Sequence, residues 1–340
     1  MTTRTRYFVI VSLLVLGVGL GTGLVAYYVG LPAGVFAGRG GPDELAFIPR
    51  DATVIAFANV NEIMTSELRQ KVHRALPMQE DGQRELLDQT GINLETDIDR
   101  VIACLYPDRD SANMPGAGMV LARGTFDEVK IEALMGAHGA HVESHNGKRL
   151  IVGEVSEGHP ASFALSFMES GLAAIGSTKL IRLAIDLHQG GANPQTGFES
   201  VTGNEELMNL VRSLDSGNNA WAVGRFDALS SQAHLPDSVS SRLPAITWFS
   251  VSGHVNGGIR GIIRADARDE EAANNLRDVV RGFTALAKMQ SGSKPQLQAM
   301  MQSLELGGTG KTVALSFTVP SEVFDVIGAA ANRAVKPQGH

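Results

Sequence analysis

VIAFANVNEIM, residues 54–64, sets the pattern from which we predict the fold. Its first half is an apolar run with β-branched and aromatic residues, which is typical of a strand. Asn61 then offers a helix cap, and the stretch continues into TSELRQKV, which has helical composition. A strand that leads directly into a helix is therefore the expected building unit.

The same pattern returns in the second half of the chain. NAWAVGRFDAL at 219–229 is similar to the opening stretch, and the strand and acid-started helix at 261–280 are similar to those at 119–135. TVALSF at 312–317 also echoes SFALSF at 162–167. This internal repeat predicts an α+β fold of two related lobes, each an antiparallel sheet packed with helices.

Residues 7–29 contain no charged side chain and could cross a membrane as one helix. Arg4 and Arg6 precede them and the next basic residue is Arg39, which favours a cytoplasmic N-terminus and an extracytoplasmic body. We expect an uncleaved single-pass anchor in the inner (cytoplasmic) membrane, in contact with the lipid bilayer. A cleaved secretory signal is the alternative, and either one exports the body. Glycine pairs at G-x-x-x-G spacing leave a homodimer open.

The expected organisation follows from these features and from a Gly-, Pro-, Ser- and Thr-rich junction. It comprises a cytoplasmic N-terminus (1–6), a transmembrane helix (7–29), a flexible linker (30–45), a first α+β lobe (46–190), an inter-lobe linker (191–203), a second α+β lobe (204–334) and a disordered tail (335–340).

Composition argues against several classes of protein. The net charge is −7 and the sequence pI is about 5.7, whereas a nucleic-acid-binding face needs clustered Lys and Arg, which the sequence lacks. Cys104 is the only cysteine and lies in an apolar run. We therefore expect no disulfide framework, no cysteine zinc site and a buried thiol.

HVESHNGKRLIV, residues 141–152, predicts a β-hairpin whose register depends on its turn. A two-residue Asn-Gly turn would pair Glu143 with Leu150 and so mix charge with core. A three-residue loop instead pairs Val142 with Leu150. We expect the second register, with Val142 in the core and His141 facing outward.

Motifs of catalysis and nucleotide binding fail their physical requirements. Gly310-Lys311-Thr312 lacks the upstream glycine and the following helix of a phosphate-binding loop, so we expect a hairpin and no nucleotide. The S-x-x-K sequence at 291–294 lacks the companion elements of a penicillin-binding site. The sequence therefore assigns no catalytic and no cofactor-binding residues, and no cofactor.

Metal ligands and aromatic platforms are not expected either. His138, His141 and His145 could meet around a metal only if the preceding helix end folded back, so they are predicted to be surface residues. The acidic loop at 108–113 lacks calcium-loop spacing. Both tryptophans and Phe249 are expected to anchor the core, as is a helical stripe formed by Leu276, Val279, Val280, Phe283 and Ala287.

Five stretches, ATVIAFANVNEIMTSELRQKV, TFDEVKIEAL, NGKRLIVGE, GSTKLIRLAIDL and NAWAVGRFDAL, together with the N-terminal apolar segment, resemble bacterial exported, membrane-anchored proteins of unknown function. The likeness covers most of residues 46–330. It implies two α+β lobes behind one membrane helix, and it transfers no site residues.

These observations favour a membrane-anchored, extracytoplasmic interaction or scaffold protein without enzymatic activity, which could bind a protein partner. A carrier or sensor that holds an apolar ligand between sheet and helices is the first alternative, since such pockets need few polar residues. A hydrolase with scattered acidic residues is the second alternative.

Overall fold

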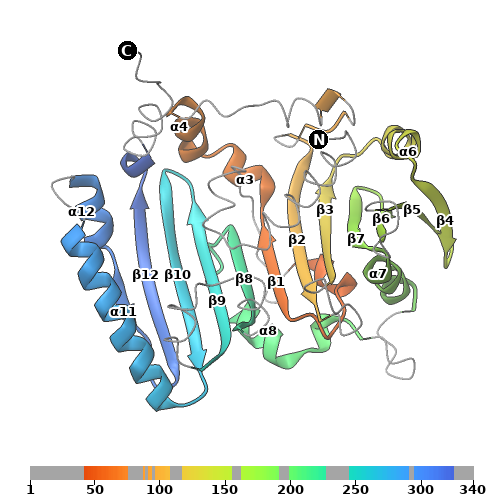
Figure 1. Cartoon of the computed structure of the whole chain (residues 1–340). Coiled ribbons are helices and arrows are strands. Elements are labelled where there is room, and N and C mark those ends of the chain that lie inside the picture. The colour runs from red at the N-terminus through yellow and green to blue at the C-terminus, as the bar shows by residue number, and fades with distance from the viewer. Residues whose placement is uncertain are drawn as a thin grey trace, which may run out of the picture.

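A computed structural model describes residues 42–75, 87–88, 91–93, 96–107, 117–154, 162–190, 199–226, 245–290 and 295–324. The strands in these ranges form one twelve-stranded sheet in the order β11-β12-β10-β9-β8-β1-β2-β3-β7-β6-β5-β4. All neighbouring strands are antiparallel. Figure 1 shows the strands side by side, with α11 along one end of the sheet and α7 near the other.

The strands are β1 Val54–Ala58, β2 Ile98–Tyr106, β3 Ala117–Gly124, β4 His141–His145, β5 Lys148–Glu154, β6 Ser162–Glu169, β7 Leu172–Ser177, β8 Ala220–Arg225, β9 Ile246–Val255, β10 Gly258–Ala267, β11 Glu305–Gly307 and β12 Thr312–Pro320. The helices are η1 Asp43–Phe47, α3 Val60–Met64, α4 Glu67–Ala75, α6 Glu128–Ala137, α7 Thr178–Gly190, η2 Val201–Gly203, α8 Glu205–Arg212, α11 Glu270–Gln290 and α12 Pro295–Gln302.

The predicted fold, a membrane helix followed by two separate lobes, is wrong for the described chain. β1 and β8, the first strand of each sequence repeat, pair with each other at the centre of one continuous sheet. Ala56 lies opposite Ala222, and the rings of Phe57 and Trp221 stack with centroids 5.5 Å apart. Both strands are almost wholly buried, so neither could remain an edge exposed to water.

The repeat is nevertheless visible in the order of the strands. Counting outward from β1 and from β8, three successive strands lie side by side, namely β1, β2 and β3 in one direction and β8, β9 and β10 in the other. The next position is filled by a strand that returns after a helix, β7 on one side and β12 on the other. TVALSF in β12 therefore corresponds in position to LAAIGS in β7. The echo between TVALSF and SFALSF, which lies in β6, does not reflect equivalent places in the sheet.

None of the described helices is long and apolar enough to cross a membrane. The predicted membrane segment at 7–29 lies outside the described residues, as do the acidic loop at 108–113 and the S-x-x-K sequence at 291–294.

The main core lies on one face of the sheet, beneath η1, α7 and α8. Residues directly opposite each other on neighbouring strands point to the same face, and the register connects Val223, Ile55, Cys104 and Met119 in one row, each at most 3% exposed. Leu180 of α7 and Val201 of η2 are among the residues that close this core. Toward β9 and β10 the same row of side chains continues with Ser250 and Arg264, so the side chains on this face change from apolar to polar.

α11 packs on the opposite face of the sheet, and only its first half is buried. Ala273 and Leu276 join Ala267 of β10 and Val313 of β12 in a small core. Phe283 is 58% exposed, so its predicted place in the buried stripe is wrong. The 3.6-residue period identifies a face of a helix, but it cannot show where the sheet beneath that face ends.

The hairpin of β4 and β5 has the register that the sequence argument rejected. Glu143 lies opposite Leu150, and a two-residue turn with Asn146 at φ 45° and Gly147 at φ 76° connects the strands. Val142 is 44% exposed, so its predicted place in the core is wrong. Tertiary contacts explain the outcome, because Arg182 of α7 pairs with Glu143 and thereby gives the carboxylate a charged partner on the core-facing side.

Candidate ligand-binding cleft

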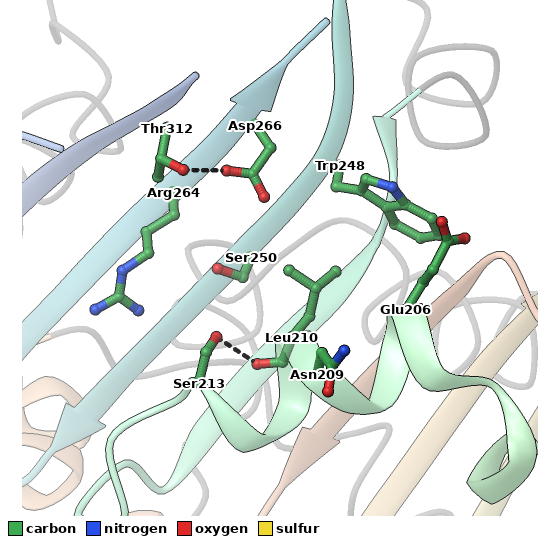
Figure 2. A pocket seen from close by; sticks show the side chains of 9 residues that line it. All are labelled: Glu206, Asn209, Leu210, Ser213, Trp248, Ser250, Arg264, Asp266 and Thr312. Carbon is green, nitrogen blue, oxygen red and sulfur yellow. Dashed lines mark hydrogen bonds between the residues drawn. The ribbon is translucent and has the colours of Figure 1, made fainter. Parts of the chain in front are cut away.

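A cleft of about 470 Å³ lies between α8 and the face of β9, β10 and β12, at the point where the apolar row becomes polar. Figure 2 shows its lining, which comes from α8 and the turn after it (Glu206, Asn209, Leu210 and Ser213), β9 (Trp248 and Ser250), β10 (Arg264 and Asp266) and the start of β12 (Thr312). The lining therefore combines hydroxyl, amide, carboxylate and guanidinium groups with one aromatic ring.

Strand register places the sheet side of the cleft. Asp266 lies opposite both Trp248 and Thr312, and Arg264 lies opposite Ser250. Successive strand residues point to opposite faces, so the alternation in β10 directs Arg264 and Asp266 to the cleft while Ala265 packs toward α11.

The helix side of the cleft is placed by the amphipathic pattern of α8. The Asn204 side chain caps the helix by accepting a hydrogen bond of 3.1 Å from the Leu207 amide. Leu207, Met208 and Val211 are buried against the main core. Glu206 and Asn209 lie on the other side of the helix and line the cleft.

Two hydroxyl groups of the lining are already engaged within the protein. Thr312 Oγ1 donates to Asp266 Oδ1 at 2.6 Å, and Ser213 Oγ donates to the Leu210 carbonyl oxygen at 2.7 Å (Figure 2). These bonds hold Asp266 and Ser213 in place, and the second carboxylate oxygen of Asp266 stays available to a ligand.

Arg264 is the exceptional group of the cleft, because its guanidinium makes no hydrogen bond or ion pair with any described residue. Its Nη1 atom is buried and has no partner. Figure 2 shows the guanidinium pointing away from the nearby Asp266. A buried guanidinium nitrogen without an acceptor costs more than a neutral group in the same position, so the site suits an incoming anion.

Neighbouring hydroxyls add to this unsatisfied polarity. Ser250 is 3% exposed and lines the cleft, and Ser252, one step further along the same face of β9, is 2% exposed and has a buried Oγ without a partner. The donors Arg264, Ser250 and Ser252 thus share one face of two adjacent strands.

A second charged cluster, at Glu44, pairs its charges within the protein, although Glu44 Oε2 is buried without a hydrogen-bond partner. Arg100 and Arg123 lie directly opposite each other on β2 and β3, and both donate to Glu44 Oε1, at 2.9 and 2.8 Å. Arg123 also donates to Glu169 at 2.7 Å. Burial would raise the pKa of Glu44, but the hydrogen bonds from the two arginines outweigh it and lower that pKa. Two positive and two negative charges cancel, which indicates a structural role.

The histidine that follows α6 and the two histidines of β4 have protein partners as well. His138 Nδ1 lies 2.8 Å from the Leu134 carbonyl oxygen, His141 Nε2 lies 3.1 Å from Glu143, and His145 Nε2 lies 2.7 Å from Asp186 of α7. Across the ranges that the structure describes, no group of three or more His, Cys, Asp or Glu residues could hold a metal ion.

The remaining sequence candidates divide between core and cleft. Burial of Cys104 raises the pKa of its thiol to about 12, as expected for an inert packing residue. Trp221 and Phe249 are each 7% exposed and belong to the core, as predicted. Trp248 lines the cleft instead. Thr312 does so too, although it was considered only as part of a phosphate-binding loop.

Sequence reasoning missed Arg264 and Glu206 altogether. In GIIRADA, Arg264 and Asp266 alternate with apolar residues, and this pattern is normally interpreted as the solvated face of a strand. The chain itself matches no protein-family model, no curated protein and no solved structure in the comparisons made with each.

Proposed function

We propose that this chain is a non-enzymatic binding protein that holds a small ligand with an anionic group, a carboxylate or a phosphate, in the cleft between α8 and the sheet. The observation that carries this proposal is Arg264, whose buried Nη1 has no acceptor. Ser250 lies opposite Arg264 on the next strand and offers a hydroxyl to the same anion.

The lining also favours this ligand over the apolar ligand considered from the sequence. A pocket for an apolar ligand is lined mainly by hydrophobic side chains, whereas this cleft presents Trp248 and Leu210 among seven polar or charged residues. An anion that accepts hydrogen bonds from a guanidinium gains strong, charge-assisted contacts. The lining therefore offers hydrogen-bonding groups that a purely apolar ligand would leave unpaired.

Arg264→Gln tests the proposal. We expect the variant to bind acetate or inorganic phosphate at least about tenfold more weakly, because a hydrogen bond to a charged group contributes about 1.5–3 kcal/mol. Because the guanidinium has no protein partner, the unliganded variant should be as stable as the parent or more stable. Isothermal titration and thermal melting of both proteins measure the two effects.

Arg260→Gln is the matched control, since Arg260 is an exposed arginine four residues away on the same strand and outside the lining of the cleft. It should leave anion binding unchanged. Equal binding by the parent and Arg264→Gln, or no binding of either anion by the parent, would refute the proposal. A marked loss of stability in unliganded Arg264→Gln would instead show that the arginine is structural.

We also propose, on the sequence alone, that the body of the protein lies outside the cytoplasm, because Arg4 and Arg6 precede the uncharged segment 7–29. A reporter enzyme that is active only outside the cytoplasm should work when it is fused after His340. Activity of a cytoplasm-specific reporter at the same position would contradict this location.

A further inference from the structure

The cleft has a positively charged side chain at one end and a negatively charged one at the other, and this arrangement indicates which class of small molecule it could bind. Glu206 and Trp248 both line the cleft, and in the view of Figure 2 they lie toward one side of it while the Arg264 guanidinium lies toward the other. Glu206 makes no hydrogen bond or ion pair with the described part of the chain. The two ends therefore present one unpaired cation and one unpaired carboxylate.

The charges of the lining do not balance for a purely anionic ligand. Arg264 contributes one positive charge, and Glu206 and Asp266 contribute two negative charges. Asp266 has a hydroxyl partner in Thr312 but no cationic one. An anion bound at Arg264 would neutralise the single cation and leave two carboxylates nearby, whereas a ligand that also carries a cation would offset one of them.

Trp248 strengthens this argument, because the face of an indole ring attracts cations. A ligand ammonium group beside Glu206 could contact both the carboxylate and the ring. Glu206 itself is exposed, so an ion pair with its carboxylate alone would contribute little to the binding free energy. Binding of the ammonium group therefore depends on the carboxylate and the aromatic ring together.

We propose that the ligand is a zwitterion with its charges at separate ends, and this inference rests on the anion site proposed above. Arg264 and Ser250 bind its carboxylate or phosphate, and Glu206 and Trp248 bind its ammonium group. The distance across the cleft sets the spacing of the two groups, so the site selects among zwitterions by length.

A series of ω-amino acids tests this proposal with the full chain. Glycine, β-alanine, 4-aminobutyrate, 5-aminopentanoate and 6-aminohexanoate keep the two charged groups and change only their separation. Each is compared with the straight-chain carboxylate and the straight-chain amine of the same length by isothermal titration. We expect one length to bind best, and at least about tenfold more tightly than the carboxylate of that length, which corresponds to about 1.4 kcal/mol.

Glu206→Gln and Glu205→Gln form a matched pair of variants, because the two residues are adjacent in the first turn of α8 and only Glu206 lines the cleft. Glu206→Gln should abolish the higher affinity for the amino acid relative to the carboxylate of the same length. The affinity for that carboxylate should stay the same or increase. Glu205→Gln should preserve the higher affinity for the amino acid.

The outcomes separate the two proposals. If carboxylates bind as tightly as the amino acids of equal length, or if Glu206→Gln keeps the higher affinity for the amino acid, the zwitterion is excluded and the anion site stands. If amines bind as well as amino acids, and neither carboxylates nor phosphate bind, the anion site itself is excluded.

Discussion

At the scale of single residues, the decisive comparison is between two arginine environments on the sheet. Arg100 and Arg123 lie opposite each other and would repel, but Glu44 accepts hydrogen bonds from both. Glu44 is only 1% exposed, and η1 places it there. Arg264 has no such carboxylate partner among the described residues. The difference separates a charge cluster that is paired within the fold from a guanidinium whose buried nitrogen has no partner on the described chain.

Glu44→Gln should destabilise the protein by about 3–5 kcal/mol, because it removes the buried carboxylate that lies between two partly buried arginines. Urea denaturation at pH 7 measures the change. Glu169→Gln is the control: its carboxylate also pairs with Arg123 but is 41% exposed, so its loss should cost less than about 1 kcal/mol. Equal costs for the two variants would contradict the structural role of Glu44.

The same carboxylate predicts a dependence of stability on pH. The pKa of Glu44 is lower in the folded than in the unfolded protein, so its contribution is present above the unfolded pKa, roughly 4.3, and is lost as the pH falls through the folded pKa. The difference in unfolding free energy between the parent and Glu44→Gln should therefore shrink below about pH 4. A constant difference between pH 7 and pH 3 would show that the charge is not responsible.

At the scale of elements, the β4–β5 hairpin shows how a turn and a partner helix together set the register. Asn146 and Gly147 both adopt positive φ, which is the backbone conformation that a two-residue hairpin loop requires. α7 then supplies Arg182 for Glu143 and Asp186 for His145. Two polar side chains of β4, Glu143 and His145, are therefore paired with side chains of α7.

Gly147→Ala should destabilise the protein by about 1 kcal/mol, because a side chain at φ 76° is strained, although a Cβ there would make only an ordinary contact with Gln189. Gly136→Ala is the matched control, since Gly136 lies in α6 and a Cβ there meets no neighbour. Removing a helical glycine should stabilise by roughly 0.5–1 kcal/mol. Thermal melts that show effects of the same sign for both variants would contradict the turn assigned here.

At the scale of the whole molecule, the β1–β8 pair makes the two halves of the sequence one folding unit. The core beneath α7 and α8 contains buried residues from both halves, including Phe57 from β1 and Trp221 from β8. Neither half could close this core alone, because each would expose one of the two central, apolar strands.

Phe57→Ala should therefore lower the stability of the entire sheet, by about 3–5 kcal/mol. Both tryptophans lie at or after β8, so their fluorescence reports on the second half, whereas far-UV circular dichroism reports on all elements. The two urea transitions should coincide in the parent and shift together in Phe57→Ala. Val129→Ala, at a site 81% exposed, should shift neither by more than about 0.5 kcal/mol. Separate transitions would show that the halves unfold independently.

The sequence by itself determined the local elements of this protein. Apolar runs identified strands such as β1 and β8, and the pattern of α8 and the inert burial of Cys104 were also predictable, because each depends on neighbours close in the chain. The hairpin of β11 and β12 followed from the same reasoning.

Only the tertiary structure decided how these elements combine. Whether two repeats form two sheets or one depends on which strand pairs with β1, and the hairpin register depends on Arg182 of α7, which lies 39 residues after Glu143. The cleft also depends on tertiary structure, since Arg264, Trp248 and Glu206 come from three elements and none of them belongs to a local sequence motif. Long-range pairing and burial fix these features, and a pattern confined to neighbouring residues does not contain them.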